Sequence, residues 1–366
     1  MAVYKIFAEK DTTLYSDYGT LNSGMDPILE ISKNTSLVYP SQSSAARFLI
    51  KFSDDDISDV LNNYIGTGSF SSSLKLYLAN STGLPTDYSI EVFPVSGAWD
   101  MGTGRFGDSP INTNGASWLY MKAGGTSPWT LANFTTGVTA SYTSTNAGGG
   151  TWYTAYRAKQ SFGVYINKDA NVDVSSAVRA IVSGSIANEG FIVKLSGSLE
   201  FNEAYNFTLN YFGRDTNTVY PPVLEFKWDD SRYTTSGSSV SGVGSQDVRI
   251  SLANNKGEYN QDEIHRFRLN VRDLIPTRTY ATSSIYTTQK YLPQTTYYSI
   301  KDVKSDITVV EFDNNFTKVS ADLQGNYFDV YMYGLEPERY YKILIKTVIS
   351  GSTLIFDDQY FFKVTE

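Results

Sequence analysis

The stretch that most constrains the fold runs from Phe212 to Trp228 and reads FGRDTNTVYPPVLEFKW. A polar loop leads to two consecutive prolines, which cannot donate hydrogen bonds to a β-ladder and therefore suit the entry of a strand. In the strand that follows, side chains two residues apart share one face, so Leu224, Phe226 and Trp228 can all point into a core. Val223 would then lie at the mouth of the strand.

The segment that follows this strand is rich in Ser and Gly and has the composition of a flexible linker. A strand that runs directly into a linker is expected to be the last strand of its domain. A chain of 366 residues is also long for a single core. We therefore predict a first domain at residues 1–232, a linker at 233–246, and one or two further domains at 247–366.

Most of the first domain shows the short alternating pattern of β-strands, most clearly in Ala46–Phe52. Only two stretches favour helices. Residues 54–65 begin with acids that suit a helix N-terminus and then show helical spacing, and residues 172–182 could be capped by Asp173 or Ser175. Many short strands with one or two short helices predict an all-β fold, with a jelly-roll β-sandwich as the leading architecture.

The second domain contains a series of alternating strands between Asp247 and Val364. A Leu335-x-Pro337-x-x-Tyr340 turn precedes one of them, and in such a turn a tyrosine hydroxyl can pin the corner of a sandwich. This region is therefore expected to form an immunoglobulin-like or fibronectin-like β-sandwich.

Several motifs of the first domain occur in the order of one known family. Over about residues 1 to 230 the chain resembles the DNRLRE-type jelly-roll domains, which are similar to carbohydrate-binding modules; the resemblance rests on Asp11–Ser16, Arg47–Phe52 with Ile57, Leu74–Leu78, Val92–Trp99, Gly102–Gly104, Gly115–Trp118, Phe212–Asp215 and Pro221–Phe226. It implies a jelly roll that binds a ligand on its surface. A trailing immunoglobulin-like unit and a surface rich in Tyr, Ser, Thr and Asn are similar to bacteriophage virion proteins.

Composition excludes several function classes. The net charge is −8 with a pI near 4.9, and no basic patch emerges that could bind nucleic acid. With no Cys and a single His, the chain lacks disulfides, thiolate metal sites and multi-histidine centres. No apolar run approaches membrane-spanning length, so we expect no membrane insertion. We also expect no cofactor.

The first ten residues carry polar side chains where a signal peptide would have an apolar core, so synthesis in the host cytoplasm without a signal peptide is expected. Our leading hypothesis is a non-enzymatic structural protein of a bacteriophage virion: a tail, neck, fibre or capsid-decoration component. It would contact other virion proteins and act as a homo-oligomer. The alternative is a carbohydrate-binding adhesin that recognises a cell-surface glycan.

A long irregular stretch from about Ser96 to Ala158 contains four of the five tryptophans. Within it, Trp99, Asp100, Arg105 and Trp118 would suit a sugar platform, because aromatic faces pack on sugar C–H surfaces while charged groups bind the hydroxyls. The alternative is that the tryptophans fill the core or anchor long loops.

Acidic side chains could also form a cation site or a catalytic pair. The run Asp54–Asp59 lacks the Gly and Glu positions of an EF-hand, and a capped helix start explains it better. Asp11 and Asp215 are weak candidates for a structural calcium site of the jelly roll. A polysaccharide-degrading enzyme would need two opposed carboxylates, and the sequence identifies no such pair, so we predict no catalytic residues and no enzymatic activity.

Overall fold

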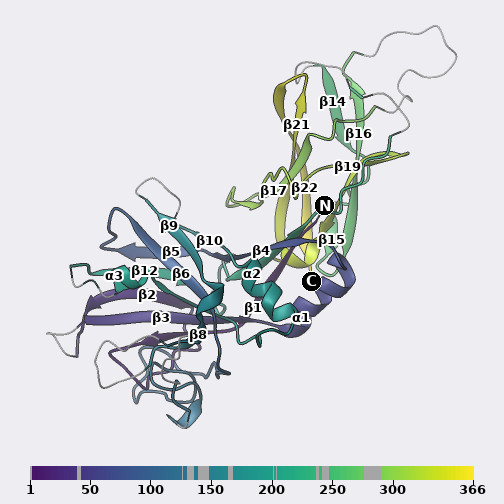
Figure 1. Ribbon diagram of the computed structural model, residues 1–366. Helices are drawn as coiled ribbons and strands as arrows, with labels where there is room; N and C mark the ends of the chain where they lie inside the picture. The colour runs from purple at the N-terminus through teal and green to yellow at the C-terminus, as the bar shows by residue number, and fades with distance from the viewer. Residues whose placement is uncertain are drawn as a thin grey trace, which may run out of the picture. The chain divides into compact units, whose positions relative to one another are not determined.

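The structure is a computed structural model (Figure 1). It describes residues 2–38, 43–125, 127–129, 136–138, 148–163, 168–200, 202, 204–235, 239–240, 247–275 and 290–366. Their regular secondary structure is mainly β-strand, paired mostly antiparallel, with a few short helices between the strands. The predicted all-β sandwich fold is therefore confirmed.

Contacts between residues divide the chain into two compact units. The first unit comprises Ile6–Gly66 and Ser71–Glu225, and the second comprises Met1–Lys5, Thr67–Phe70 and Phe226–Glu366. The division differs from the expected one in two ways. It falls inside the strand that begins at Val223, and it assigns two short segments from the N-terminal part of the chain to the second unit.

The described residues before position 230 form the strands β1 (Ala2–Tyr15), β2 (Ile28–Thr35), β3 (Ser43–Phe52), β4 (Phe70–Leu76), β5 (Leu78–Thr82), β6 (Tyr88–Pro94), β7 (Thr136–Val138), β8 (Thr151–Tyr153), β9 (Ala158–Phe162), β10 (Ala170–Asp173), β11 (Phe191–Leu195), β12 (Phe207–Phe212) and β13 (Val223–Trp228). The helices of this region are α1 (Asp54–Asp59), α2 (Ser175–Val182) and α3 (Gly197–Glu200), with a π-helix η1 (Val60–Ile65) and 3-10 turns η2 (Ala123–Gly125) and η3 (Thr154–Tyr156).

Eleven of these strands form one large sheet in the order β10-β4-β13-β1-β3-β11-β6-β9, from which β2, β12 and β5 branch next to β3. Strands that are not neighbours in this sheet still pack through their rings: Phe48 of β3 lies 6.2 Å from Tyr211 of β12, and Tyr88 of β6 lies 6.1 Å from Phe207 of β12. The strands β2, β12 and β5 therefore form a second layer that packs over the main sheet, and an aromatic core lies between the two layers.

The strand that the two prolines introduce is buried as predicted, since Leu224, Phe226 and Trp228 are all in the core. In chain order it is the last strand of the eleven-stranded sheet, as predicted, and within that sheet it lies between β4 and β1. This central position buries Val223 and Glu225 as well, and the Glu225 carboxylate is neutralised by the Lys75 ammonium at 2.8 Å.

Both predicted helices are present. The side chain of Ser53 caps α1 by accepting a hydrogen bond from the backbone N–H of Asp56, and the helix continues as η1 to Ile65. The second helix, α2, begins only at Ser175, because the residues before it form β10. Asp173 accepts a hydrogen bond from the Ser175 backbone N–H at 2.9 Å. No helix among the described residues has the length and apolar character needed to cross a membrane.

In the part of the second unit that the structure describes, the further strands and a 3-10 turn are β14 (Val248–Leu252), β15 (Glu258–Asn260), β16 (Ile264–Asp273), β17 (Thr296–Asp302), β18 (Thr308–Val310), β19 (Ser320–Asp322), β20 (Gly325–Tyr331), η4 (Met332–Gly334), β21 (Arg339–Ile349) and β22 (Ser352–Thr365). They form a four-stranded sheet β14-β16-β20-β19 and a five-stranded sheet β15-β22-β21-β17-β18.

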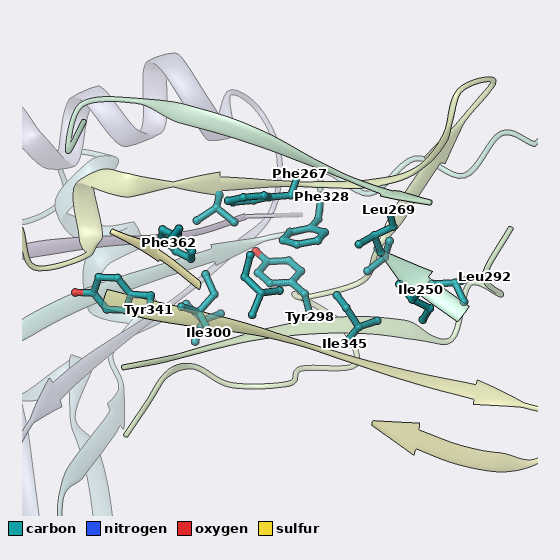
Figure 2. Packing of buried hydrophobic residues seen from close by; sticks show 14 of the residues in the cluster. Ile250, Phe267, Leu269, Leu292, Tyr298, Ile300, Phe328, Tyr341, Ile345 and Phe362 are labelled. Atoms are coloured by element: carbon teal, nitrogen blue, oxygen red, sulfur yellow. The ribbon is translucent and has the colours of Figure 1, made fainter. Parts of the chain in front are cut away.

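The core between these two sheets is rich in aromatic rings, as Figure 2 shows. Phe328 stacks on Phe267 at 5.5 Å and on Tyr298 at 4.5 Å, and Phe362 joins them from β22. The predicted tyrosine corner is also present. Its hydroxyl comes from Tyr341, which donates to the Glu336 carbonyl at 2.9 Å, while Tyr340 is exposed.

The segment predicted as a linker, 233–246, is only partly described, and residues 236–238 and 241–246 lie outside the described part. The described residues of this segment contact the second unit. Tyr233 bridges to Ala321, Ser239 bridges to Tyr291, and Val240 is buried in the core of the second unit. Composition alone therefore overestimated the independence of this segment.

Candidate functional site

The tryptophans predicted as a sugar platform lie in the interior of the first unit. Trp99 is 1% exposed and Trp118 is 3% exposed, and both belong to one core cluster with Trp129 and Trp152. The Trp99 indole N–H donates to the Glu189 carbonyl at 2.9 Å. Because their faces are already packed, these rings are not available to a ligand in this structure. They instead fill the core and anchor the long loop, which was the alternative to a sugar platform.

Beneath the tryptophans lies a buried charge network on one face of β3, β6 and β11. The Arg47 Nε is 2.6 Å from Glu200 Oε1, the Lys194 ammonium is 3.0 Å from Glu200 Oε2, and the Arg47 guanidinium lies 4.8 Å from the centre of the Trp118 ring. Burial alone would raise the pKa of Glu200, but the two cations outweigh it and hold that pKa below its usual range. The network is therefore a structural support for the loop.

Asp100 and Arg105, the charged members of the predicted platform, are both exposed. The Asp100 carboxylate accepts a 3.4 Å hydrogen bond from the backbone N–H of Ala123, and the backbone N–H of Arg105 donates to Asp108. The structure therefore separates these two surface side chains from the two buried indoles, and the four residues do not form one binding face.

A different surface of the first unit has the features of a binding site. It is a groove of about 250 Å³ that combines three aromatic rings with carboxylate, amide and hydroxyl groups, and we call it the Tyr15 groove; its lining residues are Tyr15, Ser16, Asp17, Tyr18, Glu30, Ser32, Asn34, Thr35, Leu37, Ser44, Ala45 and Phe106.

Two strands and one loop position these side chains. Tyr15 ends β1, and Glu30, Ser32 and Asn34 are spaced two apart along β2, so they share one face of the strand. Phe106 comes from the long loop, where its backbone N–H donates to Asp26 Oδ2 at 3.0 Å.

Asn22 holds the same loop from the other side. Its side-chain amide donates to the carbonyls of Met101 and Ala116 at 2.7 Å and 2.9 Å, and its Oδ1 accepts the Gly104 N–H at 2.9 Å. The amide is buried, so these contacts fix the path of the loop. As a result, Phe106 is presented at a defined place beside β1 and β2.

The Phe106 ring is 47% exposed, although it contacts Tyr15 at 4.7 Å and Tyr18 at 5.5 Å between ring centres. Nearby, burial raises the pKa of Glu30, against the opposing effect of a hydrogen bond from Ser32. Partly exposed rings next to carboxylate, amide and hydroxyl groups are the combination that binds polyhydroxylated ligands. The sequence signal that could have revealed the groove is the polar, alternating face of Glu30, Ser32 and Asn34.

The two weak calcium candidates, Asp11 and Asp215, do come close together in the fold. Asp11 lies inside β1, and the loop after β12 approaches it, so that the Arg214 N–H donates to Asp11 Oδ2 at 2.6 Å. Within the described ranges, no three or more His, Cys, Asp or Glu side chains gather in a way that could hold a metal ion by themselves.

Comparison with known proteins identifies no family. No protein-family model matches the chain, and no curated protein matches it. Among solved structures, the adhesin domain of Epf from Streptococcus pyogenes is similar with 11% identity and a TM-score of 0.18, over 100% of this chain and 98% of that one. The β-glucuronidase of Parabacteroides merdae has 9% identity and a TM-score of 0.17, over 84% of this chain and 30% of that one. Both TM-scores are too low to support an argument about function.

Proposed function

We propose that this protein is a non-enzymatic attachment component of a bacteriophage particle, and that its first unit binds a cell-surface glycan in the Tyr15 groove. The observation that carries the proposal is the groove itself: the half-exposed Phe106 ring, held against Tyr15 and Tyr18, beside Glu30 and Asn34. An aromatic face can cover the C–H surface of a sugar ring while the polar groups bind its hydroxyls.

The assignment to a phage particle rests on the sequence. It is supported by the resemblance of residues 1–230 to surface-binding jelly rolls, by the absence of Cys, and by the second, immunoglobulin-like sandwich. Particles purified from an infected culture should contain the chain, and its absence from them would contradict the assignment.

A second candidate function is assembly through protein contacts alone, and the outer face of β21 and β22 favours it. Tyr340 is 57% exposed and Phe361 is 40% exposed, and the strand register places both on the side opposite to the buried Tyr341 and Phe362. Exposed aromatic side chains of this kind are enriched in protein interfaces.

Paired variants separate the two functions. We expect Phe106→Ala to weaken binding of the purified protein to host surface polysaccharide by about fivefold, since an aromatic contact contributes on the order of 1 kcal/mol. Tyr340→Ala is the matched control, because it removes an exposed ring of the second unit, and it should leave this affinity unchanged. Titration calorimetry measures the affinity, and circular dichroism checks the fold of both variants.

Three results would contradict the proposal. Wild-type protein that binds no host polysaccharide would exclude the glycan function, and loss of particle incorporation in Tyr340→Ala would then favour protein contacts. Equal affinity of the wild type and Phe106→Ala would exclude the Tyr15 groove as the binding site. Release of reducing sugar from the polysaccharide would show that the protein is an enzyme.

A further inference from the structure

The long loop of the first unit forms another cavity besides the Tyr15 groove. Its volume is about 290 Å³, at the lower end of the range for small-ligand sites, so it suits one small group better than a chain of sugars. We call it the Lys122 pocket; it is lined by three glycines and by Thr20, Thr113, Ser117, Tyr120 and Lys122.

Hydrogen bonds within the loop hold the walls of this pocket in place. The Gly124 N–H donates to the Thr113 carbonyl at 3.1 Å, and the indole N–H of Trp129 donates to the Ser117 carbonyl at 2.8 Å. Gly124 has a φ of 72°, a conformation that favours glycine, and a Cβ added there would meet no described residue beyond its own neighbours within 4 Å. The pocket is therefore pre-formed, with open space beside Gly124.

The polar side chains of the pocket are hydrogen-bond donors, and one of them is positively charged. Lys122 is exposed, and no ion pair joins its ammonium to a residue that the structure describes. Within the same described ranges, the hydroxyls of Thr20 and Thr113 make no hydrogen bond. No carboxylate is among the described residues that line this pocket, whereas the Tyr15 groove contains Asp17 and Glu30. The Lys122 pocket therefore offers a positive charge and several hydroxyl groups to an anion.

Asp100 opposes this preference to some extent. It lies outside the pocket lining, but its Oδ2 accepts the N–H of Ala123, the residue after Lys122, at 3.4 Å. Because Asp100 is exposed, water and salt screen its charge, whereas an anion in the pocket would contact the Lys122 ammonium directly. We therefore expect Asp100 to weaken the binding of an anion without preventing it.

The arrangement of donors suits a phosphate group better than a carboxylate. A planar carboxylate is matched best by the paired N–H groups of an arginine, whereas a lysine binds phosphate as a point charge. Phosphate oxygens also point in several directions, so separate hydroxyl donors on different walls can bind them. Here Thr20 comes from the turn after β1, and Thr113 and Ser117 come from the long loop, far from it in sequence.

We propose that the Lys122 pocket binds a phosphate group of the same host surface polymer whose sugar occupies the Tyr15 groove. The inference rests on the proposed function, since it assigns a second part of the same ligand to a neighbouring cavity. Tyr18 lines the groove and Thr20 lines the pocket, and two residues of chain span at most about 7 Å. A phosphorylated surface glycan can therefore contact both cavities.

Calorimetric titration of the full chain in phosphate-free, low-salt buffer tests the phosphate site, with galactose 6-phosphate and galactose as matched ligands. The wild type should bind the sugar phosphate about fivefold more tightly than galactose, which is the effect of one exposed ion pair. Lys122→Gln should remove this preference, and Asp100→Asn should increase it. Lys159→Gln, which removes an exposed lysine of β9, is the matched control and should retain it. About 1 M NaCl should suppress the preference, because salt screens the charge.

The outcomes separate failure of this inference from failure of the proposed function. Phe106→Ala should leave the affinity for galactose 6-phosphate unchanged, while it weakens binding of host polysaccharide in the Tyr15 groove. Equal affinity of the wild type for galactose 6-phosphate and galactose, or a preference that persists in Lys122→Gln, would overturn the phosphate site even if the Phe106→Ala effect is observed. Loss of the preference in Lys159→Gln would also overturn it, since the attraction would then be diffuse.

Inorganic phosphate distinguishes the two possible sources of the anion. It should bind more weakly than galactose 6-phosphate, because the sugar adds contacts with the hydroxyl groups and with Tyr120. Inorganic phosphate that binds as tightly as the sugar phosphate would assign the pocket to free phosphate and overturn its assignment to a surface polymer.

Discussion

The two units stabilise their interiors in different ways. On one face of its sheet, the first unit buries the charges of Arg47, Lys194 and Glu200 beneath a layer of tryptophans. The second unit fills the space between its sheets with stacked rings such as Phe267 and Phe328, and buries no comparable cluster of charges within its described residues. The core of the second unit is therefore apolar throughout, whereas the first unit adds a buried ionic network to its apolar core.

The difference follows from what covers each sheet. In the second unit, two regular sheets face each other, and their alternating apolar residues interdigitate. In the first unit, an irregular loop covers the β3, β6 and β11 face. The backbone carbonyls of such a loop have no strand partner and need other hydrogen-bond donors. The Arg47 guanidinium is one such donor, because it donates to the Gly149 carbonyl oxygen at 2.8 Å. Buried charge is thus the means by which a loop is attached to a sheet.

The largest effect should come from removing the anion of this network. Glu200→Ala would leave Arg47 and Lys194 buried without their shared partner, and we expect it to destabilise the first unit by about 3–5 kcal/mol. Urea unfolding followed by tryptophan fluorescence measures the loss. The triple variant Arg47→Met, Lys194→Met and Glu200→Leu should recover part of it, because it removes all three buried charges together and leaves none without a partner. A triple variant less stable than Glu200→Ala would contradict the ionic interpretation.

A polar contact at the rim of the second unit should matter less. Tyr341→Phe removes the hydroxyl that donates to Glu336 but keeps the buried ring, so the expected loss is about 0.5–1.5 kcal/mol. Tyr340→Phe is the neighbouring control, with an exposed ring, and should change stability by less than about 0.5 kcal/mol. Equal effects of the two substitutions would show that the corner hydrogen bond does not stabilise the fold.

Sequence predicted the features that depend on local patterns. The alternation of Ala46–Phe52 gave a strand, the acids and apolar spacing of 54–65 gave a helix, and the Leu335 turn gave a tyrosine corner. In each case the decisive residues are neighbours in the chain. Local pattern could not predict that a strand followed by a Ser- and Gly-rich segment lies in the middle of a sheet.

The parts of the site that sequence missed depend on distant contacts. Trp99 and Trp118 match a sugar platform in composition, but whether an indole faces water or a sheet is decided by Glu189 and Arg47, which lie far from them in sequence. The Tyr15 groove exists because Asn22 and Asp26 hold a loop some 80 residues later. Residue types therefore indicate which kind of ligand a site could bind, whereas the position of the site depends on contacts between residues that are distant in sequence.

The smallest effect in this comparison is a pH response confined to the second unit. His265, the single histidine, is packed at 4.7 Å from Phe267, and burial lowers its pKa below 6.5 despite the opposing effects of Asn254 and Glu263. The unfolded chain therefore binds a proton more readily than the folded one, so stability should be complete above pH 6.5 and fall as the pH drops through that value. Urea midpoints of the second unit between pH 7.5 and 5 should show this fall in the wild type, and His265→Gln should flatten it. A slope that persists in His265→Gln would assign the response to carboxylates instead.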